Sequence, residues 1–218
     1  MGSRYDRNRP QAPPPRLILA SASPRRRELM EVLGVPFSVV PSRIEEEPRS
    51  GERFRAFVRR AAREKGEEVA GRHPEAYVLS ADTVVVIEGR LLGKPRDRAD
   101  AARMLRLLQG REHRVHTAVC LLRRRDAYAD EAVDTTRVTF RPLSREEIRA
   151  YLRAGESDDK AGAYAAQGRG NLLIERIAGS YTNVVGLPMT RVFGMLAAAG
   201  LVAVSRTGPG WYRFRGGR

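Results

Sequence analysis

Apolar residues along the chain follow two patterns that alternate with each other. Runs typical of β-strands lie at residues 16–20, 37–40, 77–80, 84–87, 113–122, 131–140 and 171–177. Segments with apolar residues at helical spacing lie at residues 24–33, 53–70, 98–109, 144–153 and 188–199. Because strands and helices alternate and no internal repeat is present, the pattern predicts an α/β fold with a mixed β-sheet and flanking helices.

Capping residues indicate where several elements begin. Ser23 followed by Pro24 is typical of a helix N-terminus. Ser144 and Glu147 have the spacing of a capping box, which predicts the start of another helix. Because glycine lets the backbone approach a ligand closely, we expect the Gly-rich segment 159–170 to be a loop that lines a site.

The two ends differ in composition from the rest of the chain. Residues 1–15 are rich in Arg and Pro, which predicts a disordered N-terminal tail. Residues 205–218 form a basic tail in which aromatic residues alternate with Arg. Such a tail can stack on single-stranded nucleic acid, but we expect a disordered, solubilising segment. The predicted folded domain therefore comprises residues 16–204.

The formal net charge of +14 has two interpretations. Of the 40 basic residues only Lys65, Lys94 and Lys160 are lysines, so the chain favours Arg for generic positive charge. This bias together with a small anionic ligand explains the charge better than nucleic-acid binding, which stays open as the alternative. Because a compact ammonium group cannot be replaced by a planar guanidinium at every site, the three lysines are candidates for specific contacts.

The remaining bulk features favour a soluble cytoplasmic protein without a membrane partner. The longest apolar runs are too short to span a bilayer, and the Arg- and Pro-rich start is unlike a secretory signal. Cys120 is the only cysteine and lies in an apolar run, so we expect a reduced core residue. His113 and His116 lie on a predicted strand and are expected to be structural.

The turn from Ser21 to Arg27 has the features of an anion site. A strand leads into a helix N-terminus, where free N–H groups, hydroxyls and guanidinium groups can bind phosphate. The alternative is a helix cap followed by a solvated basic turn. That alternative places positive charge against the helix dipole, which is unfavourable.

Acidic residues offer two further candidates. Asp82 lies at the end of an apolar run, where a carboxylate can orient a water molecule or hold a divalent cation. It could equally cap the backbone of a turn. The run 45–47, Glu-Glu-Glu, is either a solvated loop or part of a metal site. No His/Cys metal motif, Walker A motif or dinucleotide fingerprint is present.

Together these segments closely resemble the Maf family of nucleoside triphosphate pyrophosphatases. The resemblance covers about residues 16–200, and its motifs occur in order. They are Leu-Ala-Ser-Ala-Ser-Pro-Arg-Arg-Arg-Glu-Leu at 19–29, Arg-Glu-Lys-Gly at 63–66, Ser-Ala-Asp-Thr at 80–83, Leu-Gly-Lys-Pro-Arg-Asp at 92–97, Asp-Lys-Ala-Gly-Ala-Tyr at 159–164 with Gln-Gly at 167–168, and Val-Gly-Leu-Pro at 185–188.

The resemblance implies an elongated fold of the Maf and inosine-triphosphatase type, with two lobes around a central cleft, and a homodimer. It implies hydrolysis of a nucleoside triphosphate to the monophosphate and pyrophosphate with a divalent cation, Mg²⁺ or Mn²⁺. By motif, Asp82 matches the catalytic acid that activates water, and Glu46 together with Asp82 matches the metal position. The positions that match phosphate-binding residues are Ser21, Arg26, Lys65 and Lys94.

Three residues assign a branch within the family. Arg25, Thr83 and Gln167 match the branch that resembles dTTP/UTP pyrophosphatases, whereas the 7-methyl-GTP branch tends to carry Trp, Gln and Glu. The amide of Gln167 can accept a hydrogen bond from pyrimidine N3–H and donate one to a neighbouring carbonyl. A 7-methyl-GTP-type pyrophosphatase, a catalytically silent nucleotide-binding protein and a nucleic-acid-binding module are the alternatives.

Overall fold

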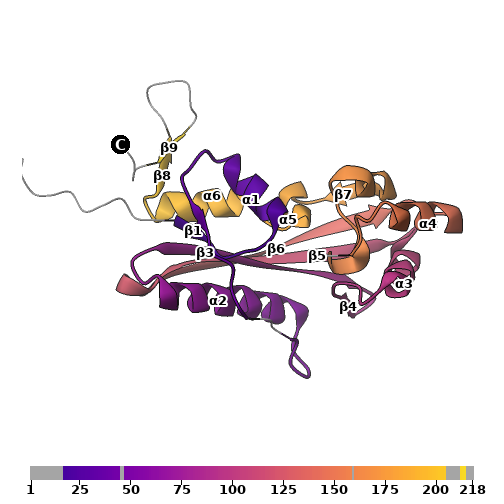
Figure 1. Ribbon diagram of the computed structural model, residues 1–218, viewed down its shortest axis with the longest axis horizontal. Coiled ribbons are helices and arrows are strands. Elements are labelled where there is room, and N and C mark those ends of the chain that lie inside the picture. The colour runs from indigo at the N-terminus through magenta and orange to yellow at the C-terminus, as the bar shows by residue number, and fades with distance from the viewer. Residues whose placement is uncertain (1–16, 45–46, 159, 205–211, 215–218) are drawn as a thin grey trace, which may run out of the picture.

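The computed structural model describes residues 17–44, 47–158, 160–204 and 212–214. A seven-stranded mixed sheet forms its centre, with strand order β2-β1-β3-β5-β6-β7 and β4 paired to β3 (Figure 1). The strands are β1 (Leu17–Leu19), β2 (Ser38–Val39), β3 (Tyr77–Ile87), β4 (Arg90–Leu92), β5 (Glu112–Arg123), β6 (Tyr128–Phe140) and β7 (Ile174–Ala178). β1 pairs in parallel with β2 and β3, and the other pairs are antiparallel. The predicted α/β class with a mixed sheet is confirmed.

Helices cover both faces of the sheet at one end. α2 (Phe54–Arg72) lies on one face, and α1 (Pro24–Glu31), α5 (Tyr181–Val185) and α6 (Met189–Ala198) lie on the other (Figure 1). The apolar face of α2 packs against alternate residues of β3, which include Val84. On the opposite face, Leu196 of α6 packs in a cluster with Leu79. No helix in the described part of the chain has the length and apolar composition needed to cross a membrane.

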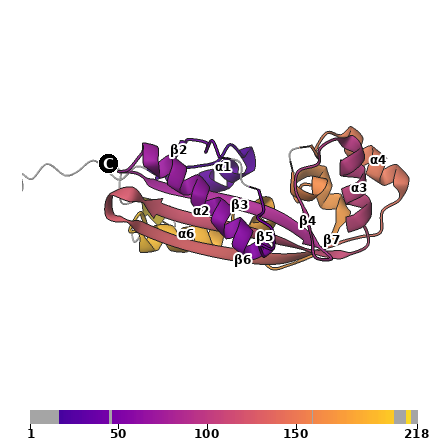
Figure 2. The same cartoon turned by 90° about the horizontal axis from the view of Figure 1, so that it is seen from below.

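The far end of the long strands carries a second group of elements. α3 (Arg98–Leu108), α4 (Arg145–Arg153), β4 and β7 lie there, as seen from below in Figure 2. Two short 3₁₀ helices, Ala161–Ala163 and Gly168–Leu173, complete this end. Leu105, Phe140 and Leu152 belong to its apolar core. The strands β3, β5 and β6 connect both ends, and a cleft between two lobes stays a prediction.

Strand β3 differs from the prediction in a way that matters for the site. The sequence predicted two strands with Ala81, Asp82 and Thr83 between them, whereas β3 is continuous from Tyr77 to Ile87. β5 pairs with it without a break from Val78 to Val86, which keeps the polar stretch extended. Asp82 therefore lies in the middle of a strand and not at its end.

Smaller differences concern the predicted ends of elements. Ser23 occupies the N-cap position of α1, but its side chain makes no capping hydrogen bond. The capping box of Ser144 and Glu147 is confirmed. The predicted strand 171–177 begins only at Ile174, because the residues before it continue a 3₁₀ helix.

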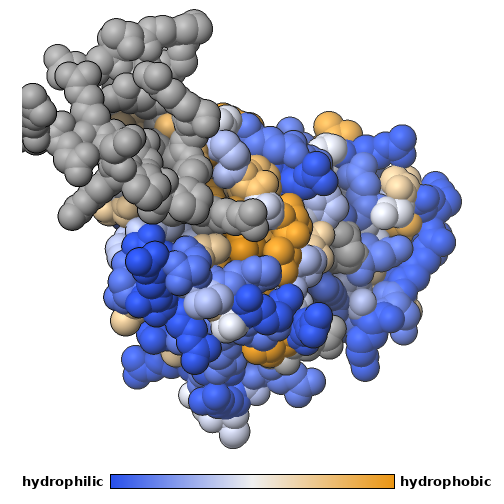
Figure 3. Space-filling view, turned by 60° about the vertical axis from the view of Figure 1, so that its left-hand side comes forward, coloured by the Kyte–Doolittle hydropathy of each residue, from blue (hydrophilic) through white to orange (hydrophobic). Residues whose placement is uncertain are grey.

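The C-terminal segment also differs from the expectation. β9 (Tyr212–Phe214), within the tail expected to be disordered, pairs antiparallel with β8 (Val202–Val204). Phe214 packs against the apolar cluster under α6, which explains why this stretch is ordered. The predicted tail at residues 1–15 lies outside the described residues. Hydrophilic residues cover most of the described face in Figure 3, as the high charge requires.

Candidate functional site

The site begins at a stretch of β3 that has a neighbouring strand on one side only. β1 pairs with β3 up to Leu79, and β4 pairs with it from Val85 onward. Between them, no strand of the described chain pairs with β3 on this side, whereas β5 continues on the other. The edge at residues 80–84 is thus open to other groups. Because side chains of a strand alternate, Asp82 and Thr83 point to opposite faces beside this opening.

Asp82 pairs with Lys65 of α2. The Lys65 Nζ donates to Asp82 Oδ1 at 2.6 Å, and both side chains are about one-fifth exposed. The other carboxylate oxygen, Oδ2, has no hydrogen-bond partner among the described residues, so it can receive a ligand. The sequence predicted both residues separately, and the fold brings them together.

Close packing of α2 on β3 makes this ion pair possible. Gly66 follows Lys65 and is buried against Ser80, whose Oγ donates to the Ala62 carbonyl at 2.6 Å. A Cβ at Gly66 would lie 2.7 Å from Ser80 Oγ, too close for any real contact. The glycine therefore sets the distance between the helix and the strand, and with it the position of Lys65.

Arg26 of α1 occupies the open edge from the opposite face. Its Nη1 donates to the Ala81 carbonyl at 2.9 Å and to Ser21 Oγ at 3.3 Å. Its Nε donates to the Gly186 carbonyl at 2.8 Å, and its Nη2 to Thr83 Oγ1 at 3.1 Å. The guanidinium thus takes the place of a missing strand by satisfying a backbone carbonyl of β3.

These contacts limit what Arg26 can offer a ligand. A guanidinium has five N–H donors, and four of those in Arg26 are directed at protein oxygens. Its predicted phosphate contact, which stays a prediction, therefore involves its positive charge and one N–H. Burial lowers the pKa of Arg26, and the charge of Asp82 opposes this shift, so the two groups interact across the opening.

The hydroxyl of Thr83 belongs to a chain of buried polar groups. Thr83 Oγ1 lies 3.0 Å from Thr117 Oγ1 of β5, which donates to the Asn183 carbonyl of α5 at 2.9 Å. The Asn183 amide in turn donates to the Val115 carbonyl and to Thr136 Oγ1. Thr117, Thr136 and Asn183 are fully buried. These hydrogen bonds connect the predicted specificity residue Thr83 to the interior of the protein.

The segment that carries Lys94 contacts the Gly-rich loop, and the part of that loop next to Gln167 contacts α5. The Gly162 amide donates to the Gly93 carbonyl at 3.0 Å, so the Gly-rich loop packs beside the exposed Lys94. The neighbour of Gln167, Ala166, accepts a hydrogen bond from Tyr181 of α5 at 3.5 Å. The predicted lining role of the loop stays a prediction for Gln167 itself.

The remaining predicted residues divide into three cases. Ser21 is buried, and its Oγ also accepts from the Ser23 amide at 3.2 Å. Arg25 lies beside Arg26 and is half-buried. Glu46 lies outside the described residues. In the part of the chain that the structure describes, no group of three or more His, Cys, Asp or Glu side chains could hold a metal ion.

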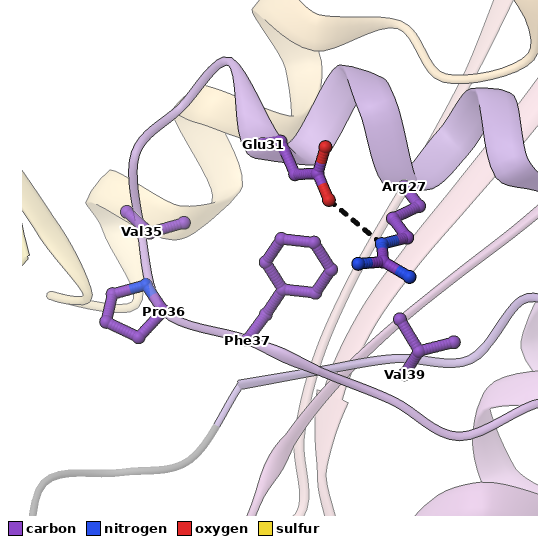
Figure 4. Close-up of a pocket in the computed structure, with 6 residues that line it drawn as sticks. All are labelled: Arg27, Glu31, Val35, Pro36, Phe37 and Val39. Atoms are coloured by element: carbon purple, nitrogen blue, oxygen red, sulfur yellow. Dashed lines mark hydrogen bonds and ion pairs between the residues drawn. The ribbon is translucent and has the colours of Figure 1, made fainter.

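A pocket of about 430 Å³ lies elsewhere, between α1 and β2 (Figure 4). Its lining includes the ion pair of Arg27 and Glu31 at 2.9 Å, beside apolar side chains such as Phe37. None of the predicted site residues lines it. We therefore place the candidate site at the opening along β3 and not in this pocket.

The two histidines on β5 and Cys120 make structural contacts. His113 Nε2 lies 2.8 Å from the hydroxyl of Tyr164, and His116 Nδ1 lies 2.8 Å from Thr135 Oγ1. Burial lowers the pKa of His113 to about 4 and raises that of Cys120 to about 12. His113 is therefore neutral and Cys120 a thiol at neutral pH, as expected for core residues.

Sequence reasoning missed the buried polar partners of the site. Thr117 lies in an apolar run and gives no signal of its own. Asn183 follows Ser180 at capping spacing, which could have revealed α5. Gly66 inside a helical segment could have indicated a close approach.

Comparisons with known proteins agree with the motifs. The family model described as Maf-like protein matches residues 16–199. The chain is 49% identical over 182 residues to the dTTP/UTP pyrophosphatase of Syntrophomonas wolfei, covering 84% of this chain and 96% of the relative. It is 51% identical over 185 residues to the dTTP/UTP pyrophosphatase of Myxococcus xanthus, covering 85% and 93%. For that of Syntrophus aciditrophicus the identity is 46% over 190 residues, covering 87% and 93%.

Proposed function

Because the chain belongs to the family of Maf-like proteins, we propose that it is a pyrophosphatase that hydrolyses dTTP and UTP to the monophosphate and pyrophosphate. The family resemblance inferred from the motifs is thereby confirmed. The similar proteins are named dTTP/UTP pyrophosphatases, which favours this branch over the 7-methyl-GTP branch.

One observation carries the proposal beyond similarity. The carboxylate of Asp82 lies at an open strand edge between two cations, paired with Lys65 at 2.6 Å and coupled to the charge of Arg26. Hydrolysis of a triphosphate needs fixed positive charges that hold the phosphates and, beside them, a group that can accept a proton from the attacking water. This arrangement supports hydrolysis more directly than nucleotide binding alone or nucleic-acid binding, which need no such carboxylate.

The proposed reaction assigns a separate role to each side chain. The Lys65 ammonium fixes Oδ1 of Asp82 and leaves Oδ2 to accept a proton from the attacking water. The water oxygen bonds to the α-phosphorus, and the bond from that phosphorus to the α,β-bridging oxygen breaks. Pyrophosphate leaves with the electron pair of that bond. Ser21, Arg26 and Lys94 are proposed to hold the phosphates.

A divalent cation, Mg²⁺ or Mn²⁺, is part of the proposal. Asp82 is the predicted ligand among the described residues, and Glu46, which lies outside them, is the second. One or two carboxylates suffice when substrate phosphates and water complete the shell, as is usual for Mg²⁺, so these residues fit the ion. When bound, it neutralises phosphate charge.

The base contacts are proposed for Arg25, Thr83 and Gln167. Thr83 is partly exposed beside Asp82, where a substrate held by its phosphates can reach it. The cytoplasmic location and the homodimer expected from the sequence also remain proposals.

Incubation with a panel of nucleotides tests the function. We expect dTTP and UTP to be cleaved faster than dATP and dGTP with Mg²⁺ or Mn²⁺ present, and each to yield pyrophosphate. A faster reaction with a 7-methyl-GTP substrate would assign the other branch. Tight binding without turnover would leave only nucleotide binding.

A further inference from the structure

In the row of hydrogen-bonded polar groups behind Thr83, the geometry determines which group donates each hydrogen and which accepts it. Thr117 Oγ1 lies 2.9 Å from the Asn183 carbonyl, and a carbonyl oxygen can only accept. The single hydrogen of the Thr117 hydroxyl is therefore donated to Asn183. Thr117 can then engage Thr83, at 3.0 Å, only as an acceptor.

The direction of this chain fixes the hydrogen of Thr83 as well. Thr83 donates its hydrogen to Thr117 and accepts one from Arg26 Nη2, which can only donate. A hydroxyl has one hydrogen and two lone pairs. The Thr83 hydroxyl therefore retains one lone pair and no hydrogen for a ligand.

Other contacts hold this order in place. The Asn183 side-chain amide donates to the Val115 carbonyl at 3.1 Å and to Thr136 Oγ1 at 3.0 Å, which anchors α5 to the sheet. Thr117 has no exposed surface, so water cannot replace its hydrogen bond to Asn183. Reversing the direction would remove the Thr117 donor from the Asn183 carbonyl and leave it only the Gly186 amide at 3.1 Å, and losing a buried hydrogen bond is costly.

The Thr83 hydroxyl is also reachable. Thr83 is partly exposed, and Gly186 lies next to it with a φ of +116°. A Cβ at Gly186 would lie 3.5 Å from Thr83 Oγ1 and 3.6 Å from Arg26 Nε. The absence of a side chain at this position leaves one side of the hydroxyl uncovered.

We propose that Thr117 is a positioning residue that makes Thr83 an obligate hydrogen-bond acceptor toward the base, so that the site selects pyrimidines that carry a hydrogen on N3. This inference rests on the proposed function and deepens it. Uracil and thymine carry N3–H, whereas N3 of cytosine has only a lone pair. In CTP the N3 acceptor would therefore face the acceptor oxygen of Thr83 without a hydrogen between them. The hydroxyl of Thr117, which does not contact the substrate, thus favours UTP over CTP.

The test compares kcat/KM for UTP and CTP in the full chain and in Thr117→Val. Valine has nearly the same shape but accepts no hydrogen bond, so Thr83 regains a hydrogen that it can donate to cytosine N3. We expect the UTP-to-CTP ratio of kcat/KM to fall about tenfold, the scale of one neutral hydrogen bond. Thr117→Ser keeps the hydroxyl and should keep the ratio.

The outcomes separate this inference from the proposed function. An unchanged ratio in folded Thr117→Val, or an equal loss for both nucleotides, would overturn the positioning role while leaving pyrophosphatase activity established. Absence of pyrophosphate release from UTP by the unmodified chain would overturn the function itself. If Thr117→Val does not fold, Thr83→Val provides the second test: it removes the acceptor and should lower the ratio, whereas Thr83→Ser should not.

Discussion

At the scale of single residues, the ion pair of Lys65 and Asp82 is central. Asp82 lies within a strand whose other residues are largely apolar, and its Oδ1 is held at 2.6 Å by an ammonium group. In a chain that otherwise prefers Arg, a lysine here supplies a compact charge on one oxygen. A guanidinium fork would engage both oxygens and compete with water for Oδ2.

Replacing Asp82 with Asn tests this role. The change is nearly isosteric, so the fold should persist, but the amide cannot accept a proton from water. We expect kcat for pyrophosphate release to fall by about 100-fold or more, the scale of a lost general base. Steady-state kinetics measures the change.

Asp134→Asn is the matched control, because Asp134 lies on β6, which does not pair with β3, and its carboxylate pairs with Arg191 of α6 at 2.9 Å. Its activity should equal that of the unmodified chain. Full activity in a folded Asp82→Asn variant would show that another group activates the water.

Residue-level prediction singled out positions that a motif or a rare residue type marks. Lys65 and Asp82 were both singled out, one by the scarcity of lysine and one by its apolar surroundings. Thr117 was not, because a threonine in an apolar strand is ordinary. Its importance follows from its contacts with Thr83 and Asn183, which lie 34 and 66 positions away in the sequence, and no local pattern reveals such contacts.

At the scale of elements, the site depends on how α2 lies on β3. Ser80 and Asp82 alternate with apolar residues and point toward the helix, as its contacts with both show. This alternation is the pattern of a strand with one polar face, although the sequence alone indicated a break there. The turn-forming tendency of Asp was overridden by continuous pairing with β5.

Gly66→Ala tests this packing. An alanine in a helix ordinarily stabilises by about 1 kcal/mol relative to glycine. Here a Cβ would lie 2.7 Å from Ser80 Oγ and 3.0 Å from Leu122, so we expect the free energy of unfolding to fall by about 1–3 kcal/mol. Denaturant titration measures it.

The control is Gly194→Ala in α6, where nothing lies within 4 Å of the added Cβ, and which should be stabilising. Adding Ser80→Ala to Gly66→Ala should recover part of the loss, because it removes the atom that clashes. Strict additivity of the two changes would contradict the close-approach explanation.

Helix starts were easier to predict than short elements. α4 begins at its capping box and α3 follows Asp97, whose side chain accepts from the Asp100 amide at 2.7 Å. α5 has five residues and escaped prediction, because one turn shows no apolar period.

At the scale of the whole molecule, the fold class was predictable but the opening in the sheet was not. The alternation of strands and helices predicts an α/β protein, whereas the gap between β1 and β4 depends on which strands pair over long distances. At that gap, Arg26 on one face of β3 lies close enough to Asp82 on the other for their charges to interact.

Stability should depend on pH through His113, which lies in the far apolar cluster against Phe140 and Tyr164. Burial lowers its pKa from 6.5 to about 4, so between these values the unfolded chain binds a proton that the folded chain does not. Stability therefore falls as pH drops through this window, by roughly 2–3 kcal/mol.

Denaturant titrations across this window measure the effect. His116, whose pKa burial also lowers, contributes in the same direction. His113→Phe should reduce the slope of stability against pH, since it removes one of the two histidines whose pKa burial lowers. An unchanged slope in that variant would show that His113 is protonated in the folded state.

The most direct test of the central claim is hydrolysis of dTTP in water labelled with heavy oxygen. Attack by water at the α-phosphorus predicts that the label appears in dTMP and that the pyrophosphate is unlabelled. Mass spectrometry of the two products distinguishes the positions. Label in the pyrophosphate, or formation of dTDP with inorganic phosphate, would contradict the account.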